Sequence, residues 1–221
     1  MKYKAIVFDL DGTLLDTIAD LGEAVNFALQ KRNLPIHTLE EYRGMVGNGV
    51  KKLVERALPQ MPVPDQVGDD VVGHDGLVDA CLADFMAYYE SHIDVHTKPY
   101  EGMTQLLQDL SDAGVALAVA SNKFQSGAEY LVKKLFPSIP FVAILGNKEG
   151  FPLKPDPAIV ETVLEKAGVE KADAALVGDS ATDMKTAANA GVTGIAVAWG
   201  YQSMAGYPVV AGTVNQLQSL L

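Results

Sequence analysis

Residues 5–13 read Ala-Ile-Val-Phe-Asp-Leu-Asp-Gly-Thr, an apolar run typical of a strand that ends in two carboxylates one residue apart. Ligands of open α/β sheets bind at the carboxyl ends of the strands, so we expect Asp9 and Asp11 to line a crevice. Alternation along an extended chain points both side chains to the same side. One such carboxylate can act as a nucleophile while its neighbour transfers protons. Because Asp and Gly are also common in solvated turns, this segment alone leaves a structural role open.

The chain after residue 99 predicts an α/β fold. Apolar runs typical of strands, at 115–120, 141–145, 174–178 and 194–198, alternate with segments of helical spacing at 102–113, 125–135, 156–168 and 181–190. Such alternation predicts a Rossmann-like parallel sheet with helices on both faces.

A long insertion separates the first predicted strand from the others. Helical spacing predicts helices at 17–32, 50–58 and 77–90, whereas proline, glycine and acidic residues predict a loop at 59–76. We therefore expect a core of residues 1–15 and 97–221, and an all-helical cap of residues 16–96 over the strand ends. The linkers near 15–16 and 96–99 are expected to act as hinges.

The composition favours a globular protein that binds a small molecule. The 221 residues are 48% hydrophobic and 20% charged, and no apolar run reaches the length of about 20 residues that crosses a bilayer. The net charge of −11 argues against nucleic acid as a partner. Cys81 is the only cysteine and is predicted to be a packing residue, which fits a reducing cytoplasm. No signal peptide and no membrane partner are expected, and we expect a monomer or homodimer.

Three further polar clusters follow the predicted strands. They are Ser121-Asn122-Lys123, the stretch Leu-Lys-Pro-Asp-Pro at 153–157 that contains Lys154, and Gly-Asp-Ser-Ala-Thr-Asp at 178–183. Each alone could be a helix cap or a solvated surface group. Since the carboxyl ends of parallel strands meet at one edge, we expect the clusters to share one crevice.

The acidic side chains of these clusters predict a metal site. Asp9, Asp11, Asp179 and Asp183 would crowd the crevice and repel one another. Mg²⁺ relieves such repulsion and prefers oxygen ligands together with substrate phosphate. The crevice therefore predicts both a divalent cation and a phosphoryl group, with Lys154 and Ser121 as further donors.

In this order, the four segments resemble the four signature motifs of the haloacid dehalogenase (HAD) superfamily, and the resemblance covers essentially the whole chain. Within the superfamily, the cap segment RGMVGNGVKKLVERAL at 43–58 and the turn Ala198-Trp199-Gly200-Tyr201 are similar to those of phosphoglycolate phosphatases. The resemblance implies a Mg²⁺-dependent phosphatase that hydrolyses a small phosphorylated metabolite, with 2-phosphoglycolate as the expected substrate.

The resemblance also implies the roles of the core residues. Asp9 would form an aspartyl phosphate, and Asp11 would serve as general acid and then as general base. Ser121 and Lys154 would hold the phosphoryl oxygens, with Asn122 beside them. Mg²⁺ would be bound by the Asp9 carboxylate, the Asp11 backbone carbonyl and Asp179, with Asp183 supporting the site from a second layer.

Further substrate contacts are expected from three polar positions. Thr13 offers a hydroxyl and an amide to an anion. Gly47-Asn48-Gly49 predicts a loop whose amides, with Asn48, could approach a small anion. Arg43 could bind a carboxylate through a bidentate fork, although pairing with Glu40 or Glu41 is an equally open alternative.

His92 and His96 have helical metal-pair spacing but no third ligand nearby, so no metal site is expected there.

Other functions stay open at this point. Asp11 argues against a dehalogenase, because a departing halide needs no proton. A β-phosphoglucomutase-like isomerase of phosphosugars, a pyrophosphatase and a nucleotidase share the expected core. A regulatory module that kept the fold without activity is disfavoured, since Asp9, Asp11 and Lys154 are all present.

Overall fold

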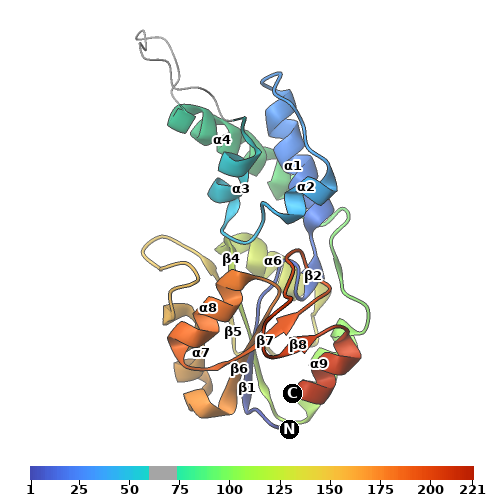
Figure 1. Cartoon of the computed structure of the whole chain (residues 1–221), viewed down its shortest axis with the longest axis vertical. Helices are drawn as coiled ribbons and strands as arrows, with labels where there is room; N and C mark the ends of the chain where they lie inside the picture. The colour runs from blue at the N-terminus through green and yellow to red at the C-terminus, as the bar shows by residue number, and fades with distance from the viewer. Residues whose placement is uncertain (60–73) are drawn as a thin grey trace.

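Six parallel strands form the main sheet of the computed structural model, which describes residues 1–59 and 74–221. The strand order is β5-β4-β1-β6-β7-β8, so β1 lies between β4 and β6 (Figure 1). The bounds are β1 Ala5–Phe8, β4 Ala116–Phe124, β5 Ala143–Asn147, β6 Ala174–Gly178, β7 Thr193–Val197 and β8 Val210–Ala211. The predicted α/β class is confirmed.

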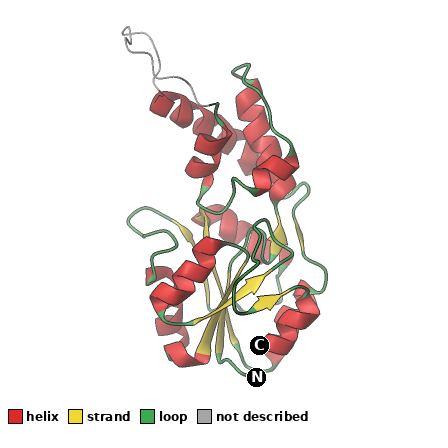
Figure 2. Cartoon of the chain, viewed as in Figure 1, coloured by secondary structure: helices red, strands yellow, loops and turns green. Residues whose placement is uncertain are grey.

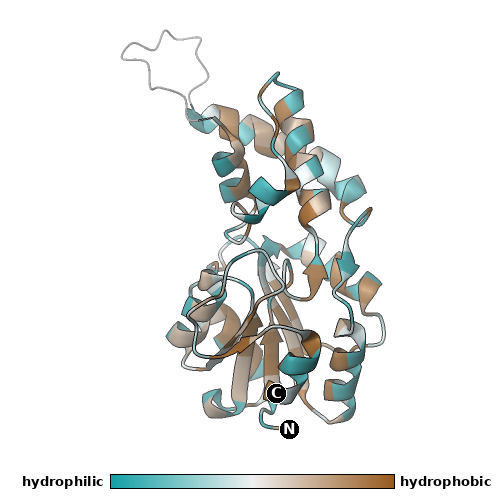
Figure 3. Ribbon diagram, turned by 45° about the vertical axis from the view of Figure 1, so that its right-hand side comes forward, coloured by the Kyte–Doolittle hydropathy of each residue, from teal (hydrophilic) through white to brown (hydrophobic). Residues whose placement is uncertain are grey.

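Helices lie on both faces of the sheet (Figure 2), and alternating residues of the strands contribute to an apolar layer on each face. Ile6 and Phe8 pack toward α5 (Met103–Asp112), α6 (Gln125–Leu135) and α9 (Val214–Leu220). Ala5 and Val7 face the other cluster, to which α7 (Ala158–Ala167) and α8 (Ala181–Ala190) contribute. The sheet is accordingly among the most apolar parts of the molecule (Figure 3). Burial on both faces explains why β1 and β6 are apolar throughout rather than alternating.

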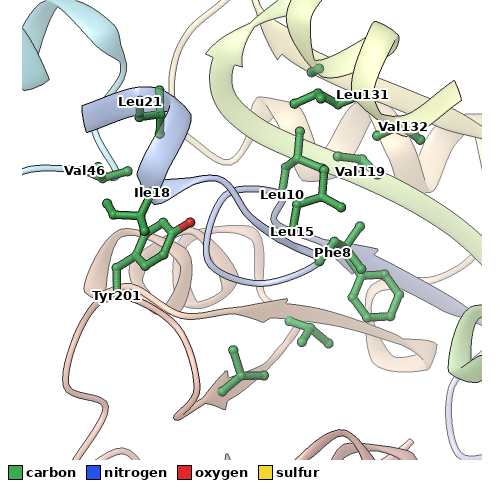
Figure 4. Close-up of a cluster of buried hydrophobic side chains, with 14 of the residues drawn as sticks. Phe8, Leu10, Leu15, Ile18, Leu21, Val46, Val119, Leu131, Val132 and Tyr201 are labelled. Atoms are coloured by element: carbon green, nitrogen blue, oxygen red, sulfur yellow. The ribbon is translucent and has the colours of Figure 1, made fainter. Parts of the chain in front are cut away.

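Within residues 16–59 and 74–96, four helices stand above the carboxyl ends of the central strands (Figure 1), and we call them the cap. They are α1 (Ile18–Gln30), α2 (Leu39–Arg43), α3 (Val50–Ala57) and α4 (His74–His92). The apolar cluster around Phe8 continues into the cap through Ile18, Leu21 and Val46 (Figure 4). The cap and the core therefore share one hydrophobic cluster.

The two linkers of the cap pair with each other. β2 (Leu15–Asp16) and β3 (Lys98–Pro99) form a small antiparallel ribbon where the chain enters and leaves the cap. Beside it, the buried carboxylate of Asp20 accepts hydrogen bonds from the backbone N–H groups of His96 and Thr97 and from the Thr97 hydroxyl, at 2.7–3.1 Å. The start of α1 is thus fastened to the returning linker.

Several predicted boundaries differ from the structure. β4 continues to Phe124 with a register shift after Ala120, so Ser121-Asn122-Lys123 lies within the strand and not after it. Helix α4 begins at His74, whereas a loop was predicted to Gly76; the rest of that predicted loop, residues 60–73, lies outside the described residues. The short elements α2, β8 and α9 were not predicted, because they are too brief to show a hydrophobic period.

Cys81 is buried in α4, as predicted. Within residues 1–59 and 74–221, no helix combines the length and the apolar character that crossing a bilayer requires.

Candidate active site

The strand order brings the polar clusters to one edge of the sheet. Asp9 directly follows β1, Asp179 directly follows β6, and Ser121 lies near the end of β4. Because β4 and β6 are the two neighbours of β1, these three segments lie side by side beneath the cap (Figure 1).

Lys154 links two carboxylates in the buried part of this edge. Its Nζ atom lies 2.8 Å from Asp9 Oδ1 and 2.5 Å from Asp183 Oδ1. The Asn122 side chain holds the Lys154 backbone from both sides: its Oδ1 accepts from Lys154 N at 2.9 Å, and its Nδ2 donates to Lys154 O at 3.2 Å. Burial lowers the pKa of Lys154, but the Asp183 and Asp9 carboxylates outweigh this and raise it above the ordinary value. The lysine is therefore a fixed, charged group.

Asp179 is held by two hydrogen bonds and by the close approach of two glycines. Thr13 Oγ1 donates to its Oδ1 at 3.1 Å, and the backbone N–H of Tyr201 donates to its Oδ2 at 2.7 Å. A β-carbon added to Gly12, whose φ is +86°, would lie 2.3 Å from Asp179 Oδ2, and one added to Gly200 would lie 2.2 Å from the Asp179 Cβ. A side chain at either position would force Asp179 to move.

The carboxylates at this edge fit a hard divalent cation. Asp9, Asp179 and Asp183 each place an oxygen within 4.8 Å of the others, and all three side chains are buried. Burial together with the charge of Asp183 raises the pKa of Asp179 to about 7 and that of Asp9 well above its usual range. Lys154 offsets only part of this negative charge, and oxygen donors of this kind suit Mg²⁺.

Asp183 differs from the other two in how its oxygens are used. Its Oδ2 accepts from Ser180 Oγ at 2.5 Å and from Ser180 N at 3.1 Å, while its Oδ1 faces Lys154. With both oxygens engaged, Asp183 is placed to orient Lys154. Asp179 also has both oxygens in hydrogen bonds, but unlike Asp9 and Asp183 it has no contact with Lys154 within salt-bridge distance.

Asp11 forms a second ion pair, with Lys123. The Lys123 Nζ atom donates to Asp11 Oδ1 at 3.1 Å and to the Tyr89 hydroxyl at 2.8 Å, and Thr17 Oγ1 donates to the same Asp11 oxygen at 2.8 Å. Burial lowers the pKa of Lys123, but Asp11 and Tyr89 raise it above the ordinary value overall. The contact of Lys123 with Asp11 was not predicted from the sequence. The signal that could have found it is the spacing of two between Lys123 and Ser121, which puts both on one side of an extended β4.

A small cavity lies between this edge and the cap. Its floor includes Asp9, Asp11, Ser121 and Lys123, and Asn122 also lines it. The cap side is apolar, formed by Leu21, Val46, Val50 and Leu53 with Gly47 and Gly49 between them. The cavity has a volume of about 30 Å³, whereas one water molecule needs about 10–15 Å³. Because only a few waters would fit, the cap is closed over the crevice.

Polar contacts hold the cap in this closed position. Gly47 O accepts from Asn122 Nδ2 at 3.2 Å, and Asn48 Nδ2 donates to Thr182 Oγ1 at 3.1 Å. Arg56 supports the same loop from behind, because its guanidinium donates to Asn48 Oδ1 and to Met45 O, each at 2.6 Å. Arg56 was not singled out by sequence, since nothing local marks it as a partner of the 45–49 loop.

The structure does not bring three of the expected substrate contacts to the cavity. Thr13 is fully buried and is turned toward Asp179. The Asn48 side chain is occupied by Thr182 and Arg56. Arg43 pairs with Glu40 at 3.2 Å and lies 5.6 Å from the centre of the Tyr201 ring, so the surface pairing left open by the sequence is the arrangement found.

The remaining aromatic and histidine positions have structural partners. Trp199 Nε1 donates to Thr13 O at 3.2 Å, which fastens the 198–201 turn to the loop after β1. His92 stacks on Tyr88 at 3.9 Å, whereas His96 lies 3.3 Å from Glu23. The two histidines thus have different neighbours.

Comparisons with known proteins point to one family. Residues 6–197 match the model of the haloacid dehalogenase-like hydrolases. The chain is 35% identical to a phosphoglycolate phosphatase of Mesorhizobium japonicum over 201 residues. This aligned region covers 91% of this chain and 85% of that protein. The chain is 36% identical over 223 residues to one of Pseudomonas savastanoi pv. phaseolicola, covering 99% and 78%. A crystal structure of a candidate phosphoglycolate phosphatase from Lactobacillus delbrueckii subsp. bulgaricus superposes with a TM-score of 0.89 at 34% identity, over 100% of this chain and 98% of the other.

Proposed function

The chain belongs to the haloacid dehalogenase-like hydrolase family, and we propose that it hydrolyses 2-phosphoglycolate through a phosphorylated Asp9. It is a hydrolase of phosphoric monoesters, like the phosphoglycolate phosphatases to which it is 35% and 36% identical. The observation that carries the proposal is the position of Asp9, which contacts Lys154 at 2.8 Å, shares a carboxylate cluster with Asp179 and opens onto the cavity together with Asp11.

The first chemical step transfers the phosphoryl group to the protein. An Asp9 carboxylate oxygen attacks phosphorus, and the bond from phosphorus to the ester oxygen breaks. The Asp11 carboxyl gives its proton to that departing oxygen, which leaves as an alcohol. Lys154 and Ser121 hold the phosphoryl oxygens, and the fixed ammonium of Lys154 stabilises the negative charge that they carry.

The second step releases phosphate. Asp11, now a carboxylate, takes a proton from water while the water oxygen attacks phosphorus. The bond between phosphorus and Asp9 breaks, which restores the Asp9 carboxylate and frees inorganic phosphate. Dividing the reaction in this way replaces one very slow hydrolysis by two easier displacements.

Mg²⁺ is the proposed cofactor, held by the Asp9 carboxylate, the Asp11 backbone carbonyl and Asp179. When bound, it would offset negative charge on the phosphoryl group and on the carboxylates. The structural support is the excess of buried carboxylates over ammonium groups at this edge. Asp183 orients Lys154 in this scheme.

Residues 16–96 are proposed to act as a cap that opens relative to the core of residues 1–15 and 97–221. A cavity of about 30 Å³ admits no phosphate ester in its present form, so substrate entry requires the cap to move. Opening would break the contacts of Asn122 with Gly47 and of Asn48 with Thr182, and the β2–β3 ribbon is the proposed pivot. Closure would exclude water during the first step.

Release of inorganic phosphate, with and without Mg²⁺, tests the proposal. The substrates would be 2-phosphoglycolate, pyrophosphate, a nucleoside monophosphate and β-glucose 1-phosphate. We expect Mg²⁺-dependent release from 2-phosphoglycolate, with kcat lowered at least about 10³-fold in Asp9→Asn. Asp112→Asn changes an exposed carboxylate on α5 and is the matched control. Conversion of β-glucose 1-phosphate to the 6-phosphate with little phosphate release would instead identify an isomerase, and faster release from pyrophosphate or the nucleotide would reassign the substrate.

A further inference from the structure

A buried hydroxyl group of the cap contacts a charged side chain of the candidate active site. Tyr89 lies in the last turns of α4 and is fully buried, yet its hydroxyl oxygen lies 2.8 Å from the Nζ atom of Lys123 in β4. Its ring is fixed by Phe85, which stacks on it at 5.0 Å, and by Phe124 of the core, which meets it edge-on at 6.1 Å. The hydroxyl is therefore held at a defined place on the boundary between cap and core.

Lys123 connects Tyr89 to Asp11, because its Nζ atom contacts both. The same Nζ atom that donates to Tyr89 donates to Asp11 Oδ1 at 3.1 Å, and it lies 4.9 Å from the centre of the Tyr89 ring. The Lys123 side chain is 1% exposed, so no bulk water is available to replace a lost partner. The position of this ammonium, and with it the direction from which Asp11 is held, depends on a residue of the cap.

We propose that Tyr89 is a positioning residue that couples the seating of the cap to the orientation of the Asp11 carboxyl through Lys123. The inference rests on the role of Asp11 as acid and base under the proposed function. Lysine is a flexible four-carbon side chain with three donors, so a second fixed acceptor restricts where its ammonium can lie. When α4 moves away with the cap, Tyr89 leaves Lys123, and Asp11 loses its aligned partner. The hold of Lys123 on Asp11, which adds to that of Thr17, is thus aligned when the cap is closed.

The leaving group of the substrate provides the test. An alkoxide, as from 2-phosphoglycolate, needs the proton of Asp11, whereas 4-nitrophenolate leaves without one. kcat/KM for each ester reports the steps up to departure of the alcohol, before water is activated. Tyr89→Phe keeps the ring and removes only the hydroxyl. We expect kcat/KM for 2-phosphoglycolate to fall about tenfold, a part of the 10²–10⁴-fold that a positioned acid supplies, while that for 4-nitrophenyl phosphate stays within about twofold.

Two controls separate a positioning role from a structural one. Tyr88→Phe removes the hydroxyl of the adjacent tyrosine on the same helix. The ring of Tyr88 stacks on Phe27 and His92, so this variant should leave kcat/KM unchanged for both esters. The double variant Tyr89→Phe with Asp11→Asn should lose no more in kcat/KM for 2-phosphoglycolate than Asp11→Asn alone, because both changes act on one proton transfer. Equal losses for both esters in Tyr89→Phe, or no loss for either, would overturn the inference.

The Asp11→Asn variant distinguishes failure of the inference from failure of the proposed function. If Asp11 is the acid, Asp11→Asn should lose kcat/KM selectively for 2-phosphoglycolate and should release a burst of 4-nitrophenol before slow turnover. Absence of this selectivity would refute the role assigned to Asp11, and the inference with it. Selectivity in Asp11→Asn without selectivity in Tyr89→Phe would refute only the coupling through Tyr89.

Discussion

The backbone of Gly200 lies directly against the side chain of Asp179. A β-carbon on Gly200 would come within 2.2 Å of the Asp179 Cβ and 2.3 Å of its Oδ2, and the next residue donates its backbone N–H to that same oxygen at 2.7 Å. The 198–201 turn therefore both makes room for the carboxylate and fixes its direction. A turn remote from Asp179 in sequence is part of the proposed metal site.

Gly200→Ala is expected to weaken the response to Mg²⁺ because Asp179 must move away from the new methyl group. Displacing a group that orients a metal ligand typically costs about 10–100-fold in affinity. The Mg²⁺ concentration that gives half-maximal phosphate release should rise by that factor. Gly44→Ala is the control, since its added methyl group would meet only one atom, at an ordinary 3.7 Å. An unchanged Mg²⁺ dependence in Gly200→Ala would contradict the account.

The protein without divalent cation should lose stability as the pH rises from about 4 to 7. Burial and Asp183 raise the pKa of Asp179 to about 7, whereas an unfolded Asp ionises near pH 3.9. In that window the folded protein keeps a proton that the unfolded chain has released, so the free energy of unfolding falls with increasing pH. The Tm of the wild type minus that of Asp179→Asn, both measured in EDTA, should therefore be smaller at pH 7.5 than at pH 5.

Mg²⁺ should act in the opposite sense, because it replaces the proton on the carboxylates. The rise in wild-type Tm on adding Mg²⁺ is therefore expected to be larger at pH 7.5 than at pH 5, and small in Asp179→Asn. Equal Mg²⁺ shifts at the two pH values would show that Asp179 does not exchange a proton for the metal.

Asp20→Asn should destabilise the protein by about 1–3 kcal/mol, because the new NH₂ group faces buried N–H donors of the returning linker. The carboxylate it replaces accepts from His96, Thr97 and the Thr97 hydroxyl. Urea unfolding would measure the loss. Glu23→Gln changes an exposed neighbour that pairs with His96, and a loss above about 0.5 kcal/mol there would remove the contrast.

Arg43→Ala and Arg56→Ala should differ in their effect on substrate binding. Arg56 donates to Asn48 and to Met45 O, and losing about 1 kcal/mol of support for the 45–49 loop should raise the KM for 2-phosphoglycolate about fivefold. Arg43 is paired with Glu40 outside the cavity, so its removal should leave the KM within about twofold. A large rise in KM for Arg43→Ala would show that Arg43 turns inward when substrate binds.

Sequence patterns predicted the core well where burial alone determines structure. Strand 174–178 and helices 125–135 and 181–190 have the predicted bounds, because a strand buried on both faces is uniformly apolar and an amphipathic helix has a clear period. The meeting of the four motifs at one edge was predictable as well, since it follows from parallel strand order alone.

Contacts between distant segments were not predictable from local patterns. Lys123 is hidden in a strand and meets Tyr89 of the cap, and Tyr201 supports Asp179 from another loop, yet neither segment carries a sign of its partner. Arg43 shows the same limit: a substrate carboxylate, Glu40 and Glu41 were all possible partners from sequence, and only the packing of α2 decides that Glu40 pairs with it. Side chains that act through a third residue need the assembled structure to be recognised.

The pairing of Leu15–Asp16 with Lys98–Pro99 also makes the cap an insertion that starts and ends at one place. The two ends of the cap leave the core side by side. The helices between them therefore form a long connection that leaves the sheet unchanged. Such an insertion can be lengthened, shortened or exchanged without altering strand order or the placement of Asp9 and Asp179. Asp9 and Asp179 therefore lie on stretches of chain that the insertion interrupts but does not contain, whereas Tyr89, which contacts Lys123, would be exchanged together with the helices.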